Sequence, residues 1–120
     1  HVGAHCAYSL AVQGIVNELV LVDKNEKKLK SEIQDLRDSV LYLPHNLSVR
    51  GADFNELKDC DILVNCVGDI TLLASHDRVQ ELNFTIAQVN DFISKVIAGG
   101  FRGIIINVSN PCDIVTYQIN

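Results

Sequence analysis

Residues 18–23 read Glu-Leu-Val-Leu-Val-Asp, a short and uninterrupted apolar run that ends in a carboxylate. Residues 61–68 (Asp-Ile-Leu-Val-Asn-Cys-Val-Gly) and residues 103–110 (Gly-Ile-Ile-Ile-Asn-Val-Ser-Asn) are runs of the same kind, and Pro111 stops the second of them. These runs are rich in β-branched residues and do not alternate polar with apolar positions. They therefore predict strands that are buried on both faces of a parallel sheet. Residues 47–51 are a weaker strand candidate.

Helical patterns lie on either side of the first run. Residues 2–12 are mainly apolar, which predicts a helix packed against the sheet, and Gly14 is expected to end it. Asn25 can cap a second helix, in which apolar residues recur at spacings of four, three and four. Pro44 is expected to end this second helix, because proline cannot continue the backbone hydrogen bonds.

A longer helix is expected after Asp77, with Gln80 three residues later as its capping-box partner. Lys95 suits the last turn of this helix, and the pair Gly99-Gly100 supplies its end. Strands thus alternate with helices, which predicts βαβ units with right-handed crossovers. The fold class is therefore α/β, a doubly wound parallel sheet of the Rossmann type.

The predicted sheet is incomplete at its start. A helix that begins at residue 2 has no strand before it, although this architecture requires one, and the chain contains no methionine. We therefore expect residues 1–120 to be a partial Rossmann domain that lacks its first strand and begins partway into a longer protein.

Composition excludes several classes of function. The 120 residues are 48% hydrophobic and 21% charged, as in an ordinary globular domain. Ten lysines and arginines against fifteen acidic residues give a net charge of −5 and leave no basic stripe for nucleic acid. No apolar run is long enough to cross a bilayer, and the first residues do not form a signal peptide. No nucleic-acid or membrane partner is expected.

Cysteine and histidine spacing points to neither disulfides nor metal. Four scattered cysteines without a Cys-x-x-Cys pair are typical of a reduced, cytoplasmic protein. His1 and His5 have the spacing of a helical metal pair, but no third ligand accompanies them. No metal site is therefore expected.

Three residues are candidates for cofactor binding. Gly3 can be the third glycine of a Gly-x-Gly-x-x-Gly motif, which lets a helix pack closely against the sheet. Asp23 ends a strand run 20 residues later, where a carboxylate would bind the adenosine ribose hydroxyls and repel a 2′-phosphate. The alternative is that Asp23 only caps the turn before Asn25. Gly68 would let the chain pass close to the nucleotide, or it is an ordinary turn residue.

At this point the order of motifs resembles the lactate and malate dehydrogenase family, and within it the bacterial L-2-hydroxyisocaproate dehydrogenase branch. The most specific element is Val-Ser-Asn-Pro-Cys-Asp at residues 108–113, similar to the family segment Val-Ser-Asn-Pro-x-Asp that follows the fifth strand. The resemblance runs along the whole chain, which implies that residues 1–120 are a partial NAD-binding Rossmann domain. It implies hydride transfer between NAD and an L-2-hydroxy or 2-oxo acid of the hydroxyisocaproate or lactate type, by a homo-oligomer.

The resemblance also implies two catalytic residues. Asn110 would lie beside the nicotinamide, which also makes it a fourth cofactor-binding candidate, and it would hydrogen-bond the substrate oxygen; the alternative is an Asn-Pro turn with a local hydrogen bond. Residues 68–78 resemble the mobile substrate loop, in which an arginine polarises the substrate carbonyl. Arg78 is the arginine available, although Glu81 occupies the place that the family's Arg-Leu-Asn segment predicts, and a surface position for Arg78 is the alternative.

The remaining catalytic groups are expected downstream of Asn120, in a substrate domain. They are a histidine general base with its aspartate and an arginine that binds the substrate carboxylate. Residues 1–120 alone should therefore have little or no turnover. The alternatives to this function are malate dehydrogenase, a non-catalytic NAD-sensing module and an NAD-using glycosidase.

Overall fold

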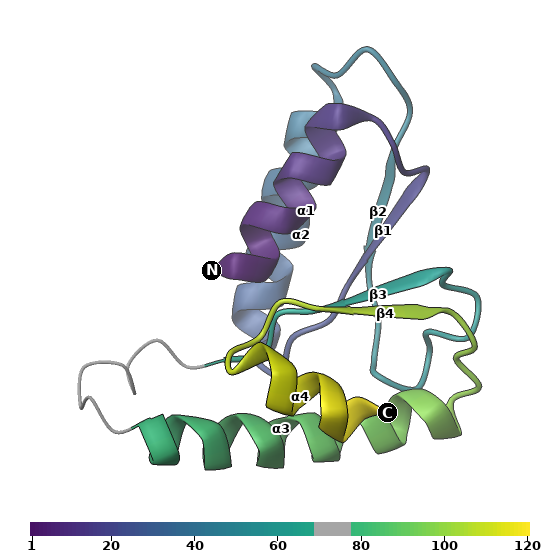
Figure 1. Ribbon diagram of the computed structural model, residues 1–120. Coiled ribbons are helices and arrows are strands. Elements are labelled where there is room, and N and C mark those ends of the chain that lie inside the picture. The colour runs from purple at the N-terminus through teal and green to yellow at the C-terminus, as the bar shows by residue number, and fades with distance from the viewer. Residues whose placement is uncertain (69–77) are drawn as a thin grey trace. The chain divides into compact units, whose positions relative to one another are not determined.

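The computed structural model describes residues 1–68 and 78–120, except for the side chains of residues 78, 80 and 81 (Figure 1). Helices and strands alternate along the chain. Their order is α1 (Val2–Gln13), β1 (Glu18–Leu21), α2 (Glu26–Val40), β2 (Ser48–Gly51), β3 (Ile62–Asn65), α3 (Arg78–Ala98), β4 (Ile104–Asn107) and α4 (Cys112–Ile119). The chain divides into two compact units, His1–Asp53 and Phe54–Asn120. No helix in the described ranges is long and apolar enough to span a membrane.

The first unit is a βαβ unit preceded by a helix. β1 and β2 pair in parallel, with Glu18 opposite Ser48 and Leu21 opposite Gly51. α1 and α2 lie on the same side of this pair (Figure 1). The core between helices and strands is built from Ala7, Ala11, Leu36 and Val49, around which half-buried leucine, isoleucine and valine side chains pack. Burial of these apolar side chains is the main force that holds the unit together.

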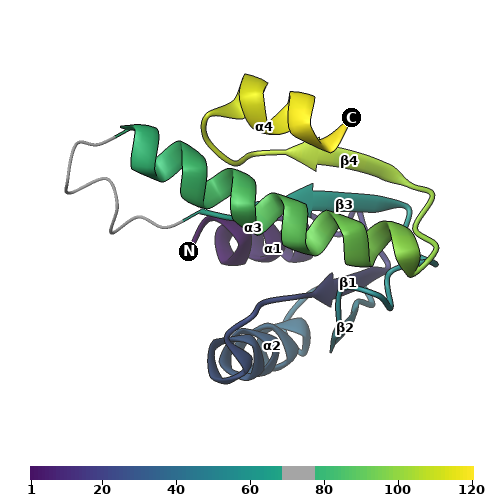
Figure 2. The same cartoon turned by 90° about the horizontal axis from the view of Figure 1, so that it is seen from below.

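The second unit has the same alternation. β3 and β4 pair in parallel, with Ile62 opposite Ile104. α3 and α4 both lie on one side of the pair and pack against each other (Figures 1 and 2). The rings of Phe54 and Phe92 stack with their centroids 5.7 Å apart. The core consists of Leu57, Val89, Phe92, Ile93, Val96, Phe101 and Val115.

Several local signals in the sequence are confirmed. Asn25 caps α2, because its side chain accepts a hydrogen bond from the Lys28 N–H at 3.0 Å. Lys95 lies in the last turn of α3, which ends at Ala98 just before the two glycines. The parallel pairing of both strand pairs confirms the α/β fold class, although the described strands form two separate pairs and not one continuous sheet.

Other expectations were wrong. β3 and β4 are not buried on both faces: Ile62 is 54% exposed and Ile104 is 66% exposed, because α3 and α4 cover only the opposite face. Pro44 does not itself end α2, which stops at Val40 in a turn closed by local backbone hydrogen bonds. α4 was not predicted, because Pro111 was interpreted only as the end of a strand.

Gly14 is required where α1 ends. It adopts a left-handed conformation (φ 66°, ψ 26°), and its N–H donates to the Leu10 carbonyl. A Cβ at this position would lie 2.6 Å from Nδ1 of His45. The His45 ring in turn bonds through Nε2 to the Ala11 carbonyl at 2.7 Å, so it cannot move away without losing that contact.

We therefore expect Gly14→Ala to destabilise the protein by at least about 1–2 kcal/mol, the cost of the left-handed conformation for a residue with a Cβ. The free energy of unfolding from urea denaturation measures the effect. Gly68→Ala is the matched control, because a Cβ at Gly68 meets no atom of the described residues within 4 Å. Equal stability of the two variants would contradict the role assigned to Gly14.

Candidate functional site

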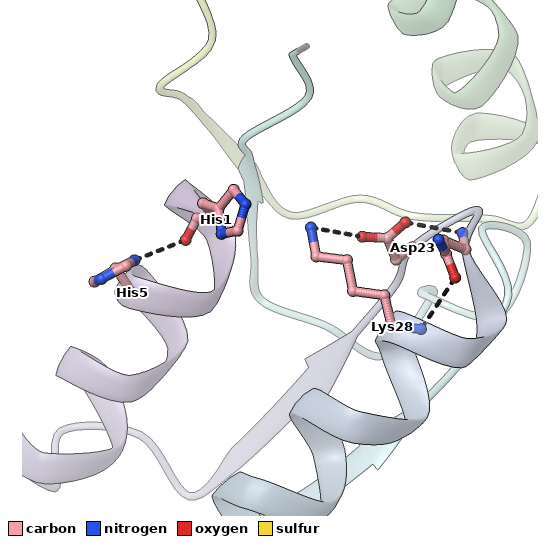
Figure 3. A network of polar contacts seen from close by, with 5 residues as sticks. His1, His5, Asp23 and Lys28 are labelled. Carbon is pink, nitrogen blue, oxygen red and sulfur yellow. Dashed lines mark hydrogen bonds and ion pairs between the residues drawn. The ribbon is translucent and has the colours of Figure 1, made fainter. Parts of the chain in front are cut away.

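Asp23 follows β1 by two residues and lies at the carboxyl end of that strand. Its Oδ1 accepts a hydrogen bond from the Asn25 N–H at 2.9 Å, and its Oδ2 lies 3.8 Å from Nζ of Lys28 (Figure 3). Asp23 therefore does close the turn before α2. Its side chain is nevertheless 38% exposed. A carboxylate can accept about four hydrogen bonds, so capacity for a ligand remains.

The turn that carries Asp23 is fixed by two side chains. Asp23 holds the Asn25 N–H, and Asn25 holds the Lys28 N–H. These bonds orient the carboxylate before any ligand arrives, which lowers the entropic cost of binding. The ion pair with Lys28 is long and partly exposed, so it contributes little and can exchange for another partner.

The start of α1 lies at the same edge of the first unit as Asp23 (Figure 3). Gly3 is in the first turn of α1, and the short connection to β1 makes the helix and the strand run in opposite directions. A helix start with exposed backbone N–H groups next to a carboxylate can receive both a phosphate and a sugar hydroxyl.

The histidines of α1 have a local role. Nδ1 of His5 bonds to the carbonyl of His1 at 2.9 Å (Figure 3). In the part of the chain that the structure describes, no group of three His, Cys, Asp or Glu residues is placed to hold a metal ion. All four cysteines are within that part, and no two of them form a disulfide.

Gly68 and Asn110 share one edge of the second unit. Asn65 and Asn107 are partners in the parallel register, and Gly68 and Asn110 each follow their strand by three residues. The Val108 N–H donates to the Asn65 carbonyl at 2.9 Å, which continues the ladder beyond the strands. The structure thus brings these two predicted site residues to the same carboxyl edge, where ligands bind in open α/β sheets.

Gly68 has no packing reason to be glycine among the described residues. It is exposed, and a Cβ there would point into open space. That open space allows a flat ligand to approach the backbone closely, so the residue fits a dinucleotide site. The open space beside Gly68 suits NAD, because the cofactor would occupy the volume that a side chain would otherwise fill.

Asn110 is exposed and precedes a cis peptide bond to Pro111. Among the described residues its side-chain amide has no hydrogen-bond partner, so the alternative of a local turn bond has no support in the described geometry. Asn110 follows β4, and Pro111 occupies the N-cap position of α4. The amide is therefore held on a short segment between a strand and a helix.

Sequence reasoning missed a pair of asparagines, the last residues of β3 and β4. Asn65 donates through Nδ2 to Oδ1 of Asn107 at 2.9 Å. Asn107 in turn contacts the backbone of Ser109 and of Cys112. A signal was present: β3 reads Ile-Leu-Val-Asn and β4 reads Ile-Ile-Ile-Asn, so each apolar strand ends in the same polar residue.

Arg78 is the first residue of α3. Its side chain lies outside the described residues, as does the segment 69–77 that was interpreted as a substrate loop. The same is true of Gln80 and Glu81. The role of Arg78 therefore stays a prediction.

Parallel βαβ units with a carboxylate after β1 and small or amide residues after β3 and β4 define a Rossmann-like nucleotide-binding fold. All of residues 1–120 match the sequence family described as lactate/malate dehydrogenase, NAD binding domain. The chain therefore belongs to the lactate/malate dehydrogenase family, as its NAD-binding part.

Relatives in this family are similar along nearly the whole chain. The L-lactate dehydrogenase of Fusobacterium nucleatum is 38% identical over 119 residues, which are 99% of this chain and 37% of that protein. L-lactate dehydrogenase 1 of Bifidobacterium longum is 38% identical over 97% of this chain and 36% of its own length. The crystal structure of the minor L-lactate dehydrogenase of Enterococcus mundtii in its ligands-bound form has a TM-score of 0.91 and 32% identity, and the match covers 98% of this chain and 37% of that one.

We expect Asp23→Ala to weaken NADH binding about 10- to 100-fold, because a hydrogen bond to a charged group contributes roughly 1.5–3 kcal/mol. Titration calorimetry with the complete polypeptide that contains residues 1–120 measures this affinity. Lys28→Met is the control, because it removes the ion pair and leaves the carboxylate. An Asp23→Ala variant that binds NADH as tightly as the parent would exclude the ribose role.

Proposed function

We propose that the polypeptide containing residues 1–120 is an NAD-dependent dehydrogenase that interconverts an L-2-hydroxy acid and its 2-oxo acid. The family membership supports NAD as the cofactor. The observation that carries the proposal is the shared edge of the second unit, where an exposed amide (Asn110) and an open glycine (Gly68) follow paired parallel strands at equal distance.

Each candidate residue has a distinct part in this proposal. NAD, when bound, accepts or supplies the hydride. Asp23 would accept hydrogen bonds from the ribose hydroxyls, and Gly68 would let the backbone lie against the nucleotide. Asn110 would donate its amide N–H to the substrate oxygen and so fix which face of the substrate carbon is presented. Arg78 would stabilise the negative charge that develops on that oxygen during reduction.

The substrate proposed first is L-lactate with pyruvate, because the relatives described above are L-lactate dehydrogenases. The L-2-hydroxyisocaproate branch is the finer alternative that the sequence pattern favours, and malate with oxaloacetate is the alternative within the same family. A homo-oligomeric state and a cytoplasmic location stay predictions.

The test is the rate of NADH oxidation by the complete polypeptide with pyruvate, 4-methyl-2-oxopentanoate and oxaloacetate. We expect turnover with pyruvate or with the branched 2-oxo acid. Asn110→Ala should lower kcat/KM for the best substrate about 100-fold, the order expected when one positioned donor to a developing oxyanion is lost. Its affinity for NADH should fall much less than kcat/KM, because Asn110 is only one of several residues proposed to contact the cofactor.

Asn46→Ala is the matched control, because Asn46 is an exposed asparagine outside both strand edges. It should not change any of these parameters. NADH binding without turnover on any of the three acids would favour a non-catalytic NAD-sensing module and overturn the proposed activity.

Arg78→Gln separates the two interpretations of that residue. If the guanidinium polarises the substrate carbonyl, kcat falls by about 100-fold or more, because a charged donor to the oxyanion is lost. Arg102→Gln, which changes an exposed arginine elsewhere in the second unit, is the control. Parent-like kcat in Arg78→Gln would assign Arg78 to the surface and leave the carbonyl to another group.

A further inference from the structure

The two asparagines that end β3 and β4 form a polar pair on an otherwise apolar sheet face. Asn65 and Asn107 are register partners, so their side chains point to the same side of the strands. Asn65 is only 3% exposed, and Asn107 is half-buried. Valine or isoleucine would fit such strand positions better, and a buried amide destabilises unless it is hydrogen-bonded. The pair therefore calls for an explanation beyond packing.

The side chain of Asn107 binds the backbone on both sides of Asn110. Its Oδ1 accepts from the Ser109 N–H at 3.2 Å. Its Nδ2 lies 3.1 Å from the Cys112 carbonyl oxygen. The same nitrogen lies 3.2 Å from Oγ1 of Thr116, in the next turn of α4. One amide thus holds the residue before Asn110 and the residue after Pro111.

Asn65 fixes which way the Asn107 amide is turned. Oδ1 of Asn65 accepts from the Val67 N–H at 3.1 Å, so its NH₂ group must face Asn107. That NH₂ group donates to Oδ1 of Asn107, so the NH₂ group of Asn107 must face α4. An amide has one acceptor end and one donor end, so each hydrogen bond in this series determines the orientation of the next amide.

Asn65 also holds the same segment through its backbone. Its carbonyl accepts from the Val108 N–H at 2.9 Å and from Oγ of Ser109 at 3.4 Å. Ser109 is 4% exposed, so these bonds lie in a region with little water to replace them. The backbone that leads into Asn110 is therefore anchored from two sides, and Asn110 itself stays exposed.

We propose that Asn107, oriented by Asn65, is a positioning residue for Asn110: it sets the backbone of residues 109–112 and so aims the Asn110 amide at the substrate oxygen. The inference rests on the proposed function, because it assigns a consequence for turnover to this network. A purely structural role, the anchoring of α4 to the sheet, would show in stability alone.

Two variants of the complete polypeptide separate these roles. Asn107→Val leaves Nδ2 of buried Asn65 without a partner, so it should lower both stability and kcat/KM. Asn65→Val/Asn107→Val replaces both partners of the bond between the two amides, so no unpaired Nδ2 stays buried. We expect the double variant to regain the part of the lost Tm that this unpaired group costs, while its kcat/KM stays about 10- to 100-fold below the parent, the order that a misplacement of ~1 Å costs.

Asn107→Asp is the third variant, and it keeps the shape of the side chain. It still accepts from Asn65 and Ser109, but it has no hydrogen to donate to the Cys112 carbonyl. We expect a raised KM for the 2-oxo acid and a lowered kcat, with the NADH dissociation constant unchanged. Ile105→Val is the matched control, because Ile105 is half-buried on the same strand. It should leave kcat, KM and the NADH dissociation constant at their parent values.

The outcomes distinguish this inference from the proposed function. If the parent shows no turnover with any 2-oxo acid, both fall. If the parent turns over and Asn107→Asp matches it, or if the double variant regains parent kcat/KM together with its Tm, then only the positioning role is overturned and Asn107 is a structural anchor. A loss of kcat/KM that persists in the double variant supports positioning.

Discussion

The parallel register of β3 and β4 is the constraint on which the rest of the second unit depends. Because Asn65 is opposite Asn107, residues at equal distance beyond the strands, Gly68 and Asn110, reach the same edge. A slip of one residue would turn every side chain of one strand to the other face. Asn65 and Asn107 could then no longer bond, so the hydrogen bond between them also favours the register that creates the edge.

In the first unit, Asp23 closes a turn and is also the proposed ligand of the cofactor's ribose. The sequence left two interpretations of Asp23, a turn cap or a ribose ligand, and the structure supports the turn bond directly. The two interpretations are compatible, because one oxygen closes the turn and the other has only a long contact to Lys28. A side chain held in place by its own turn is better prepared for a ligand than one free to rotate.

What could be predicted from the sequence was decided by local chemistry. The C-terminal ends of α1 and α3 follow from a left-handed glycine and a glycine pair, and the start of α2 follows from a capping asparagine; each of these acts within a few residues. The exposed face of β3 and β4 could not be predicted, because an apolar run does not say which neighbours cover it. The Asn65–Asn107 bond joins residues 42 positions apart, so it could be predicted only with the strand register known. α4 was missed because Pro111 both ends the strand segment and begins a helix. Gly3 became a candidate through the glycine motif that the fold requires, whereas Arg78 became one only through the family resemblance.

The position of the Asn65–Asn107 pair indicates that its main effect is not on the stability of the fold. A net hydrogen bond contributes only about 0.5–1.5 kcal/mol, and two apolar side chains at a buried cross-strand position would contribute a similar amount by packing. Stability alone therefore gives little reason to prefer amides over valines at Asn65 and Asn107. The directionality of hydrogen bonds does give a reason to prefer amides, because one amide can bind a donor and an acceptor at the same time and an apolar side chain can bind neither. Asn107 uses both ends of its amide on the two backbone groups that flank the exposed Asn110, where direction would matter for the substrate contact proposed for Asn110.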